Sequence, residues 1–145
     1  MNAENSRHVV DHFVKGLAAG DLDLQTEVCA PDMVVEYPQS REQFNGWANV
    51  RAHAENYPGG VPTGTGKVVG SEDRWVTTPS FTILRIEGTG DTYTLVGRAN
   101  YPDGTEWQTM ALIELRGGKV AKMTTIFGAP FDPPHWRAQW AERMP

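Results

Sequence analysis

Apolar positions follow a helical spacing at the start of the chain and a strand-like spacing later. From residue 4 to residue 19, apolar side chains recur every three or four positions, which predicts an amphipathic helix. The members of this stripe are Val9, Val10, Phe13, Val14 and Leu17. Gly20 is expected to end the helix, and Asp21 to cap a second helix over residues 22–29.

A short strand is predicted over residues 33–37, where Met-Val-Val-Glu-Tyr ends at Pro38. Proline has no backbone N–H to donate, so it stops the strand. After a polar turn, Asn45 is expected to cap a third helix that Pro58 ends. The apolar stripe of this helix comprises Trp47, Val50, Ala54 and Tyr57.

The second half of the chain reads as strands separated by turn signals. A loop is expected over residues 58–66, and extended segments over 67–77, 81–87, 93–101, 107–115 and 119–127. Helices followed by antiparallel strands predict an α+β fold, with the helices on one face of a curved sheet. The tail, 128–145, opens with three prolines and ends in a short predicted helix with Trp136 and Trp140.

Composition narrows the class of protein. The chain has 145 residues, which predicts one domain over 1–145, and its net charge is −5. Without a basic stripe, nucleic acid and anionic membranes are not expected partners. The polar N-terminus has no apolar signal segment and no long apolar run follows, so a cytoplasmic location is expected. The single cysteine, Cys29, excludes an internal disulfide.

Three segments carry a resemblance to a known family: Phe-Val through Ala-Gly-Asp-Leu-Asp at 13–23, Val-Glu-Tyr-Pro at 35–38, and Gly-Lys-Val through Ile-Phe-Gly at 118–128. In these three segments the chain resembles members of the nuclear transport factor 2-like superfamily, near its SnoaL-like polyketide cyclase and ketosteroid isomerase-like branches. The resemblance implies a cone-shaped α+β barrel, in which three N-terminal helices pack on a strongly curved, mainly antiparallel sheet. It also implies a largely apolar pocket for a small-molecule ligand, usually in a homodimer.

Two catalytic constellations of that superfamily are not retained. Steroid isomerases use a tyrosine, an aspartate and a protonated acid at positions that correspond here to Phe13, Tyr37 and Ala111. Limonene epoxide hydrolases use an Arg-x-Asp pair and a further aspartate. Those positions correspond to the Arg-Ala-Asn run at 98–100 and to Thr125, so only the arginine remains.

Glu36 is the best sequence candidate for a catalytic acid or base, because desolvation beside aromatic residues would raise its pKa toward neutrality. The alternative is that strand alternation points Glu36 outward and Tyr37 inward. Tyr37 is expected to donate a hydrogen bond to a substrate carbonyl or enolate, or else to be a core phenol. Arg98 would supply a cation if its strand face is concave, and would be solvated otherwise.

Further residues are expected to line a substrate pocket, although ordinary core packing is the alternative for the aromatic ones. They are Phe13, Trp47, Trp75, Tyr93, Asn100, Trp107, Thr109, Ala111, Thr125 and Phe127. His8 and His12 have the spacing of half a helical metal site, but without an acidic third ligand no metal is predicted. His53 and Arg51 flank the third helix's stripe; either side chain can reach the pocket rim, and exposure to solvent is the favoured alternative for both.

Three functions fit these patterns. The first is an enzyme that performs a cofactor-free acid–base step, such as isomerisation, cyclisation or dehydration, on an apolar or polyketide-like molecule. In this enzyme, Glu36 would transfer the proton, while Tyr37 and Arg98 would stabilise the negative charge that develops on the substrate. The second is a non-catalytic carrier whose pocket only binds. The third is a dimerisation module in which the aromatics around Trp136 bury against a partner.

Overall fold

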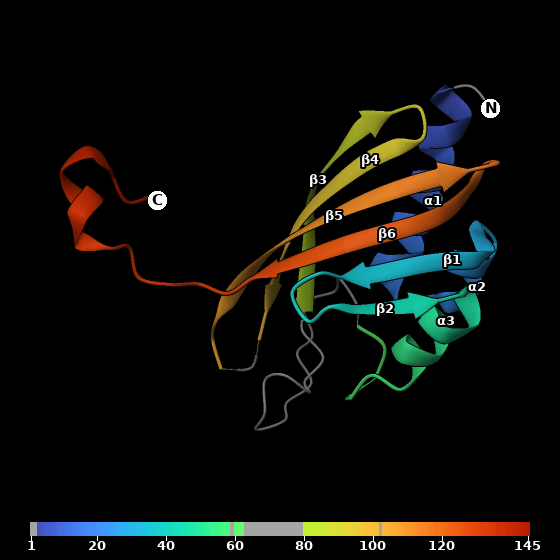
Figure 1. Cartoon of the computed structure of the whole chain (residues 1–145), viewed down its shortest axis with the longest axis horizontal. Coiled ribbons are helices and arrows are strands. Elements are labelled where there is room, and N and C mark those ends of the chain that lie inside the picture. Colours follow the sequence, from blue (N-terminus) through green and yellow to red (C-terminus); the bar gives the residue numbers. More distant parts are fainter. Residues whose placement is uncertain (1–2, 59, 63–79, 102) are drawn as a thin grey trace.

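Helices pack behind a strongly curved sheet in the computed structural model, which describes residues 3–58, 60–62, 80–101 and 103–145 (Figure 1). The helices are α1 (Ala3–Ala19), α2 (Leu22–Thr26), α3 (Trp47–Glu55) and the 3₁₀-helix η2 (His135–Trp140). The strands are β1 (Cys29–Tyr37), β2 (Glu42–Asn45), β3 (Ser80–Thr89), β4 (Thr92–Asn100), β5 (Glu106–Arg116) and β6 (Lys119–Gly128).

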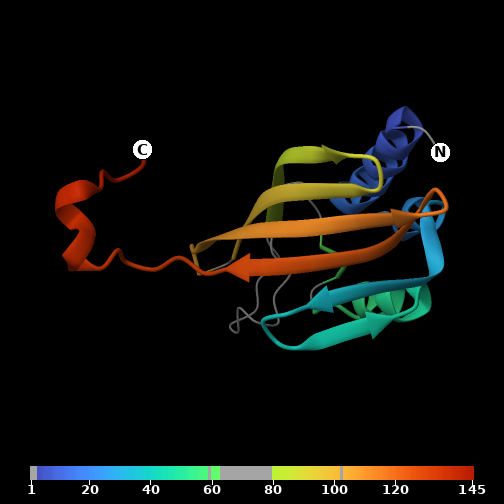
Figure 2. The ribbon, with the colours of Figure 1, turned by 45° about the horizontal axis from the view of Figure 1, so that its top comes forward.

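The strands form one sheet in the order β2-β1-β6-β5-β4-β3 among the described residues. Among these described strands, only β1 and β6 run parallel, and every other neighbouring pair is antiparallel. Figure 2 shows how the sheet bends, with α1 and α3 on its inner side. The predicted α+β fold, with helices on one face of a curved and mainly antiparallel sheet, is confirmed.

Helix α1 follows the predicted apolar stripe. Val10 and Phe13 are almost completely buried against the sheet, as expected for positions three apart on one helix face. Gly20 ends the helix with a φ of 65°, a left-handed conformation that glycine adopts without strain. Asp21 then caps α2, because its Oδ1 accepts a hydrogen bond from the Leu24 N–H at 2.9 Å.

The second predicted helix is too long. Helix α2 ends at Thr26, since the chain enters β1 at Cys29, where it pairs with Val120 of β6. Strand β1 therefore begins four residues before the predicted strand and includes Pro31. Long-range pairing between strands decides this boundary, whereas the helical signal is local.

The cap of the third helix is also not the predicted one. Residues 42–45 form strand β2 by pairing with β1, with Val35 opposite Phe44 and Tyr37 opposite Glu42. Gly46, at a φ of 87°, makes the turn from β2 into α3. The predicted strand 67–77 lies outside the described residues, while the remaining predicted strands agree with β3 to β6 within two residues at each end.

The hydrophobic core lies between the inner face of the sheet and the helices. Its most buried side chains include Met33 of β1, Ile113 of β5 and Val120 of β6, all fully inaccessible. No helix in the described part of the chain is long and apolar enough to cross a membrane.

Candidate active site

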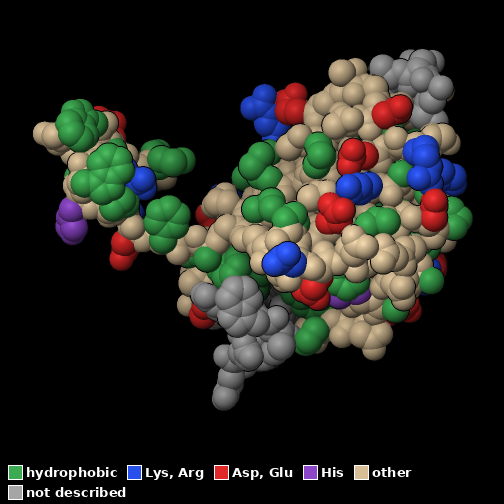
Figure 3. All heavy atoms as spheres, in the orientation of Figure 1, with side chains coloured by type: hydrophobic (Ala, Val, Ile, Leu, Met, Phe, Trp, Pro, Cys, Tyr) green, Lys and Arg blue, Asp and Glu red, His purple; other side chains and the backbone are tan. Residues whose placement is uncertain are grey.

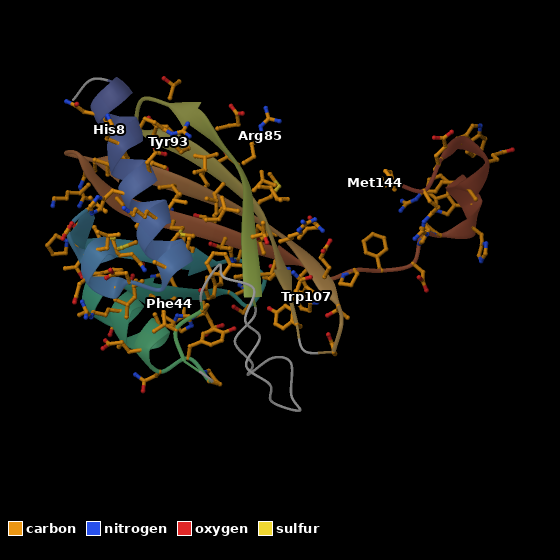
Figure 4. The ribbon with its side chains drawn as sticks, turned by 180° about the vertical axis from the view of Figure 1, so that it is seen from behind. His8, Phe44, Arg85, Tyr93, Trp107 and Met144 are labelled. Carbon is orange, nitrogen blue, oxygen red and sulfur yellow. The ribbon has the colours of Figure 1, made fainter. Side chains whose placement is uncertain are left out.

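A cavity of about 650 Å³ lies between the helices and the inner face of the sheet, within the size range of small-molecule sites. Residues from α1, α2, α3 and all six strands line it. In Figure 4, Phe44 lies beside α3 and Trp107 lies near the β4–β5 turn. The aromatic lining residues are Phe13, Tyr37, Phe44, Trp47, Tyr57, Phe81, Tyr101, Trp107 and Phe127.

Strand β1 separates the two leading candidates. Val35 and Tyr37 line the cavity, whereas Glu36 points to the other face of the strand. There the Glu36 carboxylate lies 3.2 Å from the Lys122 ammonium and accepts a hydrogen bond from the Thr124 hydroxyl at 3.4 Å. The geometry therefore places a phenol, and not this carboxylate, in the cavity wall.

Aromatic rings surround Tyr37. Its ring makes edge-to-face contacts with Phe44 at 5.3 Å, Phe127 at 5.4 Å and His53 at 6.0 Å between centroids. Burial raises the pKa of Tyr37 to about 12, helped by the negative charge of Glu42. Tyr37 is therefore a neutral hydrogen-bond donor at physiological pH.

Gln39 holds this wall in place. Its side-chain amide donates to the Phe127 carbonyl, and its Oε1 accepts from the Phe127 N–H at 2.6 Å. This pair of bonds ties the turn after β1 to the end of β6. It thereby fixes Phe127 against the Tyr37 ring.

His53 belongs to the same wall. It extends from α3 into the aromatic cluster, 4.4 Å from Phe44 and 6.1 Å from Tyr57 between ring centroids. Burial lowers the pKa of His53, and the nearby carboxylate of Glu42 partly opposes this effect. At neutral pH the imidazole is therefore uncharged and able to accept a proton.

The lowered pKa of His53 predicts a pH-dependent stability. Between that pKa and about 6.5, the unfolded chain binds more protons than the folded one. The free energy of unfolding should therefore fall as the pH drops from 7.5 to 5. Urea titrations at both values should show a smaller fall for His53→Gln than for the wild type. An equal fall in the free energy of unfolding for the two proteins would contradict this placement of the imidazole.

Most of the predicted lining residues lie together in the cavity. Those that line it are Phe13, Trp47, Trp107, Thr109, Ala111, Thr125 and Phe127. Tyr93 is instead buried in the core near α1 (Figure 4), and Trp75 lies outside the described residues. Arg98 and Asn100 occupy the positions on β4 that alternate with the buried ones, and Arg98 lies 3.9 Å from the Glu106 carboxylate.

His53 is the main site residue that the sequence pattern did not favour: of its two alternatives, exposure and the pocket rim, the structure shows the second, because the side chain is half-buried in the lining. A signal was present. His53 follows Val50 by three residues, so both lie on one face of α3, and Tyr57 follows four residues later, just beyond the end of the helix. Arg51, on another face of α3, instead pairs with Asp23 at 2.9 Å.

The cavity carries little charge. Among its described lining residues there is no lysine or arginine, and Glu42 is the one carboxylate. Thr125 is buried in the lining, and its hydroxyl has no hydrogen-bond partner among the described residues. No group of three or more His, Cys, Asp or Glu residues able to hold a metal lies within the described part of the chain.

Comparison with known structures supports the fold. A nuclear transport factor 2-like protein of unknown function from Burkholderia xenovorans LB400 is 28% identical, with a TM-score of 0.73 over 98% of this chain and 97% of its own. A ketosteroid isomerase-like protein from Kribbella flavida DSM 17836 is 20% identical, with a TM-score of 0.79 over 99% and 92%.

A third similar structure, from Silicibacter pomeroyi DSS-3, is described as having a cystatin-like fold. It is 19% identical, with a TM-score of 0.60 over 88% of this chain and 75% of its own. No curated protein matches the chain significantly. The protein-family model of the SnoaL-like domain matches residues 10–123 of this sequence. That span includes β1, α3 and most of the cavity wall. The chain therefore belongs to the SnoaL-like domain family.

Proposed function

We propose that the cavity binds a small, uncharged, largely apolar molecule bearing a carbonyl group, and that the protein catalyses proton transfer at the carbon beside that carbonyl. Such a step underlies isomerisation, cyclisation and dehydration of ketones and polyketide-like molecules. The observation that carries the proposal is the pairing of Tyr37 and His53. One is a neutral donor and the other a neutral base, and their rings lie 6.0 Å apart in one apolar wall.

In the proposed reaction, the imidazole of His53 takes a proton from the α-carbon, and the C–H electron pair moves into the enolate. The Tyr37 phenol donates a hydrogen bond to the carbonyl oxygen, where negative charge develops. His53 then returns a proton to carbon. Glu42 lies close enough to influence the pKa of both groups, so its charge favours the imidazolium formed midway.

The charge of the cavity supports an uncharged ligand. A carboxylate or phosphate would leave water for a site whose described lining offers no cation, at a large desolvation cost. Neutral ketones avoid that cost, and the aromatic lining supplies apolar contact. In this proposal the catalytic base is His53, since Glu36 is paired with Lys122 on the opposite face of β1.

In the proposed complex, the Thr125 hydroxyl makes a second polar contact with the bound ligand. Removing its unpartnered hydroxyl with Thr125→Val should raise the free energy of unfolding by about 1 kcal/mol, because a buried polar group without a bond is costly. The same change should weaken binding of 2-naphthol, a planar phenol, in a fluorescence titration. Thr109→Val, at a less buried lining position, is the matched control. Lower stability combined with unchanged binding would contradict this role of Thr125.

The proposed activity is tested with 2-tetralone, a bicyclic ketone whose α-protons are acidic. We expect the protein in D₂O to accelerate exchange of those protons, measured by proton NMR. The rate should saturate with substrate, and 2-naphthol should inhibit it competitively. An exchange rate equal to that of 2-tetralone in buffer without protein would contradict the proposed chemistry.

A non-catalytic carrier is the second candidate, favoured by the predominantly apolar lining. The same experiment separates the two functions. A carrier would bind 2-naphthol in the cavity and leave the exchange rate of 2-tetralone unchanged.

A further inference from the structure

A buried amide in the cavity wall has no role in the proposed reaction. Gln25 of α2 is only 5% exposed and lines the cavity, yet its side chain takes part in no hydrogen bond among the described residues. Such an amide is costly to bury, because it has lost contacts with water and gained none in the protein. It carries both N–H donors and a carbonyl acceptor, so it can bind either a hydroxyl or a carbonyl group of a ligand.

The polar neighbours of Gln25 hold α2 against α3. The Thr26 hydroxyl accepts hydrogen bonds from the Trp47 indole N–H at 2.9 Å and from the Arg51 guanidinium at 3.1 Å. Arg51 also pairs with Asp23, in the first turn of α2, at 2.9 Å. These bonds occupy the neighbouring polar groups and fix the helix that carries Gln25. Its amide is therefore positioned before a ligand binds, which lowers the entropic cost of binding.

A glycine in α1 makes room for this side chain. At Gly16, a Cβ atom would lie 2.8 Å from the Gln25 Cγ and 3.2 Å from the Gln25 backbone nitrogen, which is too close for a packed side chain. Glycine inside a helix is destabilising, since it loses more conformational freedom on folding than other residues do. Here it allows α2 to pack closely on α1 with Gln25 in the cavity wall.

Gln25 and the proposed catalytic pair lie toward different ends of the cavity. Trp47, which bonds to Thr26 beside Gln25, is the first residue of α3. His53 follows it by six residues, a rise of about 9 Å along the helix axis. Figure 1 shows α2 beside the start of β1, whereas Tyr37 is the last residue of that strand. The wall between the two ends is mainly apolar and aromatic.

The Gln25 end of the cavity is uncharged. Glu42 is the one carboxylate of the described lining, and it belongs to the other end, where it is the register partner of Tyr37. Figure 3 shows acidic and basic side chains close together on the outer face of the sheet, where Glu36 lies 3.2 Å from Lys122. A ligand group beside Gln25 would have no ion to pair with, so a neutral group is favoured there.

We infer that Gln25 is a specificity-determining residue, and that the substrate is an elongated apolar molecule with a polar group at each end. The reactive ketone lies at the Tyr37 end, and a hydroxyl or second carbonyl binds the Gln25 amide. This inference rests on the proposed function for the placement of the ketone. A ligand of the same length with one polar group would cover the amide with apolar surface and leave it unpaired. Sites of this kind discriminate against ligands that lack the hydrogen-bonding group.

The test compares two rod-shaped phenols by isothermal titration calorimetry. 4-Phenylphenol carries one hydroxyl, whereas 4,4′-biphenol carries one at each end. The wild type should bind 4,4′-biphenol about 10-fold more tightly, as expected for one further hydrogen bond to a buried group. Gln25→Met keeps the length of the side chain without the amide, and it should bind 4,4′-biphenol no more tightly than 4-phenylphenol. Leu22→Met, at an apolar lining position of the same helix, is the matched control and should keep the wild-type preference.

Equal affinities of the wild type for the two phenols would overturn the inference, as would a preference for 4,4′-biphenol that persists in Gln25→Met. Urea titration of Gln25→Met should show no loss of stability, because the amide that it removes has no partner. A large loss would also overturn the inference, since the amide would then be bonded within the protein.

The exchange of 2-tetralone protons tests the proposed chemistry separately. Exchange without discrimination between the two phenols would refute the role of Gln25 and leave the proposed function standing. Discrimination without exchange would leave the role of Gln25 in binding and refute the catalysis.

Discussion

His53→Gln is expected to slow α-proton exchange of 2-tetralone by about 10²- to 10⁴-fold, the usual contribution of a positioned general base. Glutamine is similar in size and stays polar, but it accepts no proton at neutral pH. The loss should fall on kcat, with KM little changed, because the neutral imidazole also contributes apolar contact that glutamine retains in part. Proton NMR in D₂O at saturating ketone measures the effect.

Glu36→Gln is the matched control for that experiment. Glu36 is the carboxylate that the sequence pattern favours as the acid or base, yet its side chain lies 3.2 Å from Lys122, on the strand face opposite Tyr37. We expect this variant to keep its exchange rate within about twofold of the wild type. Full activity in His53→Gln together with a large loss in Glu36→Gln would reverse the assignment of the base.

Phe13→Ala is expected to lower the free energy of unfolding by about 3–5 kcal/mol, a large part of the stability of a typical domain. Phe13 is only 2% exposed and belongs both to the core cluster and to the cavity lining. Truncation would remove its contacts and widen a space that already exists, which the surrounding side chains have no means to refill.

Urea titration monitored by circular dichroism measures this loss. Phe13→Leu, which keeps an apolar side chain at the same position, should cost about 1.5 kcal/mol or less. If Phe13→Ala lost under about 1 kcal/mol, the α1–sheet packing would contribute far less than its burial implies.

The architecture was predictable because it rests on local periodicity. The α1 stripe and the alternation of β4 and β5 appear directly in the residue pattern. Alternation along β1 also predicted the two faces of that strand as one alternative, with Tyr37 inward and Glu36 outward. What the pattern did not supply was a reason to prefer the alternative in which the carboxylate leaves the pocket.

Strand β2 and the position of His53 depend on tertiary structure. Glu-Gln-Phe-Asn at 42–45 contains no β-branched residue, and it becomes a strand because β1 offers it a partner. His53 is a polar residue at the border of an apolar stripe. Such a residue is usually exposed, and it is half-buried here because β1 and β2 bring Tyr37 and Phe44 against it.

The most direct test of the proposed site is a crystal structure of the protein with 2-naphthol, whose flat rings and hydroxyl mimic the enol of 2-tetralone. We expect the naphthol oxygen within about 2.6–3.2 Å of the Tyr37 hydroxyl, with the adjacent ring carbon facing the imidazole of His53. A naphthol bound outside the cavity, or one inside it with its hydroxyl turned away from both side chains, would contradict the proposed site.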